Sequence, residues 1–176
     1  MLQRIQTVYL AITFVLSLLL FFIPFAGFDL LGVTSKAGEV LSESYSFTVV
    51  GLHKSLVGSD AAAATSTSVY AYSISLMILE IVILLVNIIG IGLYKKRIFQ
   101  MRFNTLNILL NLGFYPLFFL FAWTVSERIA SDLGVSVSIS YYFPIVFPVV
   151  NMLLTYLAIR AIGKDEALIR SLDRIR

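Results

Sequence analysis

Four long apolar stretches follow one another along the chain, separated by segments that are charged or rich in serine and glycine. They lie at about residues 7–25, 69–93, 105–125 and 141–162. Each has about the length that a helix needs to cross the ~30 Å of hydrocarbon in a bilayer. Because the stretches are continuously apolar, they predict helices rather than the alternating strands of a membrane barrel. We therefore expect an all-α membrane protein, a bundle of four transmembrane helices that forms a single domain over residues 1–176.

The segment between the first two stretches, residues 26–68, is expected to contain β-structure. Its sequences FDLLGV and SYSFTVVGL are rich in β-forming residues, and the turn-prone TSKAGE lies between them. We expect a strand near residues 28–33 to pair with another near residues 45–52.

The segment between the last two stretches, residues 126–140, supplies a candidate third strand. At its end Val135, Val137 and Ile139 alternate with serines, and alternation at period two predicts a half-buried strand. A lone hairpin is marginal in water, whereas a third strand at residues 135–141 would complete a small sheet.

The composition agrees with a membrane protein. Hydrophobic residues make up 59% and charged residues 13% of the 176 residues, whereas a soluble domain has nearer half and a quarter. The net charge of +3 does not indicate nucleic-acid binding, because most basic residues flank the apolar stretches.

The positions of the basic residues predict the orientation in the membrane. One side of the four stretches carries Arg4, Lys95, Lys96, Arg97, Arg102, Arg160, Lys164, Arg170, Arg174 and Arg176. The other side carries only Lys36, Lys54 and Arg128. Because cytoplasmic segments are enriched in Lys and Arg, we expect both termini and the tail at residues 163–176 in the cytoplasm. The predicted sheet from the two outer loops, residues 26–68 and 126–140, is then extracytoplasmic.

Three sequences on the predicted cytoplasmic side carry a family resemblance. MLQRIQTVYL, YKKRIFQMRFN and AIGKDEALIRSLDRIR together resemble an uncharacterised family of small inner-membrane proteins from the Bacteroidota, known only as a domain of unknown function. The resemblance covers the whole chain and implies a four-span protein of the bacterial inner membrane. It brings no catalytic residues and no activity. Separately, four spans with a strand-rich first outer loop look like the claudin-type layout, although the claudin cysteine pair and tryptophan motif are absent.

Glu80 is the sharpest candidate for chemistry, because it lies near the middle of the second stretch. An ionisable residue there is costly and marks a functional site by default. Ser73, Glu80 and Asn87 are spaced by sevens and share one helix face. The functional interpretation is a proton or ion site. The structural interpretation, which we favour, is a protonated carboxyl that hydrogen-bonds to a neighbouring helix.

Asparagines form a second polar pattern. Asn104, Asn107 and Asn111 share one face of the third stretch, with Asn104 at its inner boundary, and Asn151 lies in the fourth. They could form a polar path with Glu80. We favour hydrogen bonding between helices, worth about 0.6–2 kcal/mol for each bond.

The tail carries a candidate docking stripe. Leu168, Leu172 and Ile175 fall on one face of a helix. Such a stripe would rest on lipid headgroups or dock a partner protein, and the sequence leaves both interpretations open.

The sequence contains no motif of a nucleophile elbow, a phosphate loop or a zinc site, and it has no cysteine. We therefore expect no enzymatic activity and no cofactor. The leading hypothesis is an accessory or scaffold subunit of an inner-membrane assembly. The alternative is a small oligomeric transporter or ion-conducting protein that uses Glu80 and the asparagines of the third stretch. The expected partners are the lipid bilayer and a membrane protein, with homo-oligomerisation left open.

Overall fold

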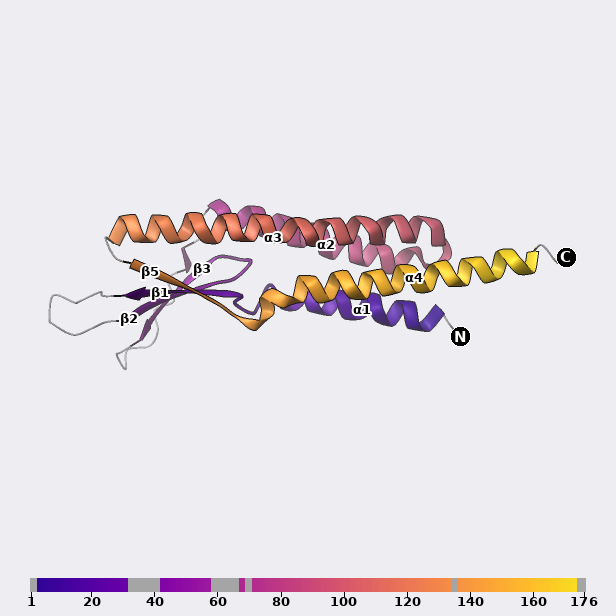
Figure 1. The fold of residues 1–176 in the computed structure, drawn as a ribbon, viewed down its shortest axis with the longest axis horizontal. Coiled ribbons are helices and arrows are strands. Elements are labelled where there is room, and N and C mark those ends of the chain that lie inside the picture. Colours follow the sequence, from indigo (N-terminus) through magenta and orange to yellow (C-terminus); the bar gives the residue numbers. More distant parts are fainter. Residues whose placement is uncertain (1–2, 32–41, 58–66, 69–70, 134–135, 174–176) are drawn as a thin grey trace. The chain divides into compact units, whose positions relative to one another are not determined.

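The computed structural model describes residues 3–31, 42–57, 67–68, 71–133 and 136–173 (Figure 1). Most of them are helical, in α1 (Gln3–Leu19), α2 (Ala71–Gly92), α3 (Arg97–Leu133) and α4 (Phe147–Asp173), with 3-10 turns at Leu93–Lys95 and Phe143–Val146. The strands are β1 (Ala26–Leu31), β2 (Ser42–Phe47), β3 (Leu52–Val57), β4 (Thr67–Ser68) and β5 (Ser136–Tyr141).

The chain forms two compact units. The helical unit consists of Met1–Leu19, Leu79–Phe114 and Val146–Arg176. The sheet unit consists of Leu20–Ile78 and Tyr115–Ile145. The helical unit therefore holds α1, α4 and parts of α2 and α3, and the sheet unit holds the strands together with the remaining turns of α2 and α3.

Three helices of the described residues are long and apolar enough to cross a membrane. These are Ser73–Gly92, Arg97–Ser131 and Phe143–Leu168, which correspond to the second, third and fourth predicted stretches. The apolar part of α1, Gln6–Leu19, is shorter. The structure confirms three helices of spanning length, and the fourth span stays a prediction.

The first predicted stretch, residues 7–25, is only partly helical. α1 ends at Leu19. The chain then turns, and Pro24 lies in neither a helix nor a strand. Proline has no N–H for the helical ladder and disfavours helical backbone at the residue before it. The backbone N–H of Phe25 then donates to the carbonyl of Phe47 at 3.0 Å, which ties this segment to the sheet. One apolar run thus covers a helix and the approach to a strand.

The third and fourth helices are longer than their apolar stretches predicted. α3 continues to Leu133, through much of the predicted outer loop 126–140, and its residues Val125 and Ile129 are buried one turn apart. α4 continues to Asp173, so the described part of the tail 163–176 is the end of this helix rather than a separate one. Apolarity marks the part of a helix that suits hydrocarbon, whereas polar residues such as Glu, Lys and Arg also favour helix and extend it.

The five described strands form one antiparallel sheet in the order β4-β3-β2-β1-β5. β1 lies between β2 and β5, with Phe28 opposite Tyr45 of β2 on one side and opposite Ile139 of β5 on the other. The predicted pairing and the third strand are both confirmed. The serine alternation in β5 places Val137 and Ile139 on its more buried side.

The predicted single strand at residues 45–52 is wrong, because a hairpin turn interrupts it. β2 ends at Phe47, which lies opposite Leu52 of β3. In the turn between them, the backbone N–H and the hydroxyl of Thr48 donate to the carbonyl of Gly51 at 2.9 and 3.0 Å. The sequence TVVG is rich in β-forming residues, so local propensity alone did not reveal the turn.

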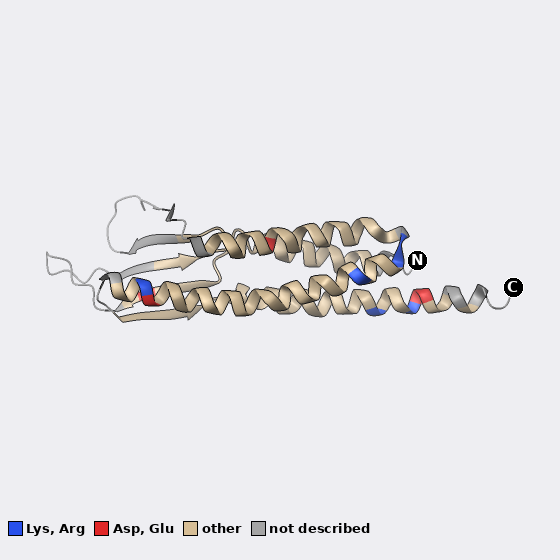
Figure 2. Cartoon of the chain, turned by 90° about the horizontal axis from the view of Figure 1, so that it is seen from above, with Lys and Arg blue, Asp and Glu red and all other residues tan. Residues whose placement is uncertain are grey.

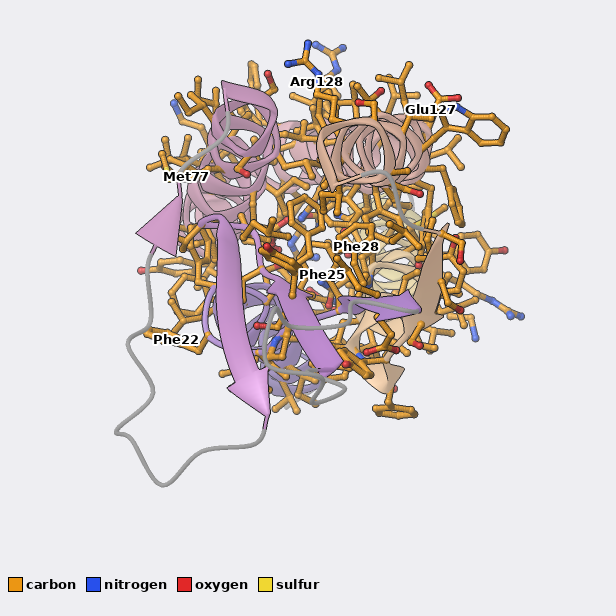
Figure 3. All side chains as sticks on the ribbon, turned by 90° about the vertical axis from the view of Figure 1, so that its left-hand side faces the viewer. Phe22, Phe25, Phe28, Met77, Glu127 and Arg128 are labelled. Carbon is orange, nitrogen blue, oxygen red and sulfur yellow. The ribbon has the colours of Figure 1, made fainter. Side chains whose placement is uncertain are left out.

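Aromatic side chains form the core of the sheet unit. The rings of Phe25 and Phe47 lie edge to face with centroids 5.2 Å apart, and Phe118 of α3 approaches Phe25 at 5.1 Å. Figure 3 shows Phe25 and Phe28 directed into this unit, whereas the exposed Phe22 points away from it. Such pairs add about 0.5–1.5 kcal/mol beyond the burial of apolar area.

Phe118→Ala should destabilise the sheet unit far more than Phe119→Ala. Phe118 is fully buried, and its neighbour Phe119 is 49% exposed, so the two variants remove the same atoms from different surroundings. Truncating a buried phenylalanine costs about 3–5 kcal/mol. The free energy of unfolding in mixed micelles, measured by titration with a denaturing detergent, should separate them. Equal losses would contradict the assigned core.

Candidate polar site in the helical unit

The helical unit has polar side chains at many of its buried positions. Buried polar residues occur on all four helices, at spacings of three or four along α3: Gln6, Thr13 and Ser17 on α1, Glu80 and Asn87 on α2, Gln100, Asn104, Asn107 and Asn111 on α3, and Asn151, Thr155 and Asp165 on α4. Many large apolar side chains of the same helices are exposed instead, among them Ile78, Leu85, Leu109 and Leu153. A polar interior beneath an apolar exterior suits a lipid environment, in which polar groups must find partners inside the protein.

One group of these residues joins α1, α2 and α4 around Glu80. The Nδ2 of Asn151 donates to the hydroxyl oxygen of Ser17 at 2.9 Å. The same hydroxyl is hydrogen-bonded to the carboxyl of Glu80. All three side chains are at most 1% exposed. Ser17 therefore connects an amide on α4 to a carboxyl on α2.

A second group joins α1, α2 and α3 around Asn87. The Oδ1 of Asn87 accepts hydrogen bonds from the hydroxyl of Thr13 at 3.0 Å and from the Nδ2 of Asn107 at 2.7 Å. The Nδ2 of Asn111 donates to the Oδ1 of Asn107 at 2.7 Å and to its carbonyl at 2.9 Å. Four polar side chains thus form one chain of contacts across three helices.

Two further contacts lie nearer the ends of the helices. The Nε2 of Gln6 on α1 donates to the Oδ2 of Asp165 on α4 at 2.5 Å. The Nε2 of Gln100 on α3 donates to the carbonyl of Gly90 on α2 at 2.9 Å. Asn104 packs against Gly90, where an added Cβ would lie 2.8 Å from its Oδ1.

The order of these contacts along the chain fixes the directions of the helices within the unit. Gln6 meets Asp165 and Ser17 meets Asn151, so α1 and α4 are antiparallel. The contacts of Gly90 with Gln100 and of Asn87 with Asn107 make α2 and α3 antiparallel as well. The start of α1, the end of α4 and the connection from α2 to α3 consequently lie at one end of the helical unit (Figure 1).

The structure buries every intramembrane candidate from the sequence but divides them between two groups. Glu80 and Asn151 belong to the group around Ser17, whereas Asn87, Asn107 and Asn111 belong to the group around Asn87. Sequence reasoning missed Thr13 and Ser17, which connect α1 to the other helices. Their spacing of four on an otherwise apolar helix was a signal that could have found them.

The predicted docking stripe is only partly described. Leu168 is 56% exposed on α4. Leu172 lies within α4, and Ile175 lies outside the described residues. Asp165, in the same segment, is buried and accepts a hydrogen bond from Gln6. Its role in the fold is to hold the end of α4 against α1.

One comparison with known protein families matches nearly the whole chain. The family model described as a domain of unknown function (DUF4293) matches residues 2–175. The chain belongs to the DUF4293 family. A comparison with curated proteins gives no match.

The basic positions of this DUF4293 protein lie toward one end of the helical unit. Among the described residues of that unit, they are at the start of α1, in the connection from α2 to α3, at the start of α3 and in the second half of α4 (Figure 2). Within the described residues, no group of three or more His, Cys, Asp or Glu is placed to hold a metal ion. The polar interior is therefore built from amides, hydroxyls and a single central carboxyl.

Gly90→Ala should destabilise the helical unit, whereas Gly92→Ala should not. An added Cβ at Gly90 meets the fully buried Asn104, but at Gly92 it meets nothing within 4 Å. Overpacking costs about 1–3 kcal/mol, while Gly92, the last residue of α2, has φ −67° and ψ −28°, which alanine adopts without strain at a gain of about 0.4–1 kcal/mol. Detergent titration of unfolding should therefore give shifts of opposite sign.

A double variant checks the cause of this difference. Asn104→Ala removes the atom that the new Cβ meets, so Gly90→Ala/Asn104→Ala should recover stability relative to Gly90→Ala alone. No recovery would mean that Asn104 is not the obstacle.

Proposed function

We propose that this protein is a non-enzymatic accessory or scaffold subunit of an assembly in the bacterial inner membrane. In this proposal all four helices cross the bilayer, both termini are cytoplasmic, and the sheet is extracytoplasmic. The observation that carries it is the combination of an interior joined by hydrogen bonds between helices with an exposed apolar residue, Leu168, near the end of α4.

Support for four crossings comes from the helical unit. Three helices have spanning length, and α1 runs antiparallel to α4 and meets the same polar interior. The start of α1 and the end of α4 lie at the same end of the unit as the basic connection from α2 to α3, which is the arrangement that an even number of crossings and the positive-inside rule require. The sheet draws β1 to β4 from one predicted outer segment and β5 from the other, which favours a claudin-type layout.

Support for a scaffold role comes from the end of α4. α4 continues for two further turns beyond the contact between Gln6 and Asp165, toward the same end as the start of α1 (Figure 1). Leu168 lies in this extension and is more than half exposed. An apolar side chain among charged residues, on a helix anchored by a buried hydrogen bond, suits a fixed docking element.

A transport or ion-conducting role is the second candidate. The observation that favours it is the Oε1 atom of Glu80, which is buried and has no hydrogen-bond partner in the described part of the chain. Four helices leave little room for a solute path in one protomer, so this role would require an oligomer.

The proposed orientation can be tested with reporter fusions. A reporter that is active only in the periplasm should be silent after Arg176 and active when inserted after Gly58, because these sites lie on opposite sides of the proposed membrane. The opposite pattern would reverse the proposed topology.

The docking role can be tested with Leu168→Asp and the matched variant Ala167→Asp. Both positions are exposed on α4 and receive the same charge, but they face different directions. If Leu168 docks a membrane protein, co-purification of that protein from native membranes should fall at least tenfold for Leu168→Asp and remain for Ala167→Asp, a difference of about 1.4 kcal/mol or more. Equal behaviour of the two variants would favour contact with lipid headgroups and contradict docking.

A further inference from the structure

We propose that Ser17, Glu80, Asn151 and Thr155 form a binding site for one monovalent cation inside the helical unit. Na⁺ is the probe that tests it. The site does not depend on the scaffold role, because the residues that form it are separate from the end of α4.

The first step is the charge of Glu80. Its side chain is 1% exposed. The sequence contains no Lys or Arg at residues 5–35, 55–94, 103–127 or 129–159, which include the central parts of all four helices. A buried carboxylate needs a compensating positive charge or must be neutralised. Since no basic side chain is available nearby along these helices, the compensation must come from a proton or a bound cation.

The second step is the set of oxygen atoms around Glu80. Its Oε1, the Oδ1 of Asn151 and the Oγ1 of Thr155 are all buried, and none has a hydrogen-bond partner within the described residues. Polar atoms buried without partners are rare in folded proteins. A proton on the carboxyl would supply one donor and the hydroxyl of Thr155 another, whereas a cation can be coordinated by all three oxygens at once.

The third step is convergence. Asn151 and Glu80 both bond to the hydroxyl of Ser17, so the amide and the carboxyl lie beside one another between α1, α2 and α4. Thr155 follows Asn151 by one helical turn on the same face of α4 and is fully buried. Three helices therefore bring a carboxyl, an amide and a hydroxyl together at Ser17, and the hydroxyl of Thr155 lies one turn of α4 away.

The final step is the choice of ligand. Carboxylate, amide and hydroxyl oxygens are hard ligands that suit alkali and alkaline-earth cations rather than transition metals. A single carboxylate neutralises one positive charge. A divalent ion would leave a net charge in a low-dielectric interior, so the donor set favours a monovalent cation.

The test is thermal unfolding of the purified full-length protein in mild detergent, with NaCl replacing choline chloride at constant ionic strength. A cation that binds only the folded state raises Tm in a saturable way. We expect this rise for the wild type and its loss in Glu80→Gln, which keeps the size of the side chain. A response to choline equal to that for Na⁺, or no response at all, would overturn the proposal.

Two threonine variants test the proposed site independently, in case the Glu80 variant does not fold. Thr155→Val removes a proposed ligand, whereas Thr13→Val makes the same change at an equally buried position whose hydroxyl already bonds to Asn87. Thr155→Val should weaken the Na⁺ response at least tenfold, and Thr13→Val should lower the starting Tm but retain the response. If both variants respond to Na⁺ as the wild type does, the assigned site is wrong.

Discussion

Hydrogen bonds between buried side chains of different helices are the interaction on which the helical unit depends. Lipid tails are as apolar as leucine, so apolar contact alone gives helices no reason to choose one another in a bilayer. In this protein the choice is made by polar pairs such as Asn87 with Asn107 and Gln6 with Asp165. Each pair specifies both a partner helix and an axial position. The antiparallel order of the helices, and the place of the start of α1 and the end of α4 at one end of the unit, follow from these pairs.

The two units have cores of different composition. The sheet unit buries aromatic rings, with Phe25, Phe47 and Phe118 packed edge to face or stacked, as a structure in water would do. The helical unit buries amides and hydroxyls and exposes leucine and isoleucine. The surrounding medium decides which side chains gain by being inside, so this contrast agrees with the proposal that the helices lie in lipid and the sheet in water.

Much of the fold could be predicted from the sequence, and the errors have physical causes. Continuous apolarity located three helices of spanning length, and the serine alternation located β5. Helix ends were predicted poorly. An apolar stretch indicates which part of a helix suits hydrocarbon, whereas the helix propensity of the residues decides where the helix ends. Long-range pairing could not be predicted either: nothing local to Ser17 shows that it contacts Glu80 and Asn151, which are 63 and 134 residues away.

Two kinds of polar side chain in the interior differ in role: amides join helices to one another, whereas for the carboxyl of Glu80 we propose a role in binding. Asparagine and glutamine can donate and accept at once, and Asn87, Asn107 and Gln100 all use these groups to join helices. If position 80 served packing alone, an amide there would satisfy both the hydroxyl of Ser17 and the free Oδ1 of Asn151 without a charge. An ionised glutamate instead adds a second acceptor oxygen near the unpartnered Oδ1 of Asn151. Helix association alone does not need an ionised carboxyl, whereas the proposed cation site does.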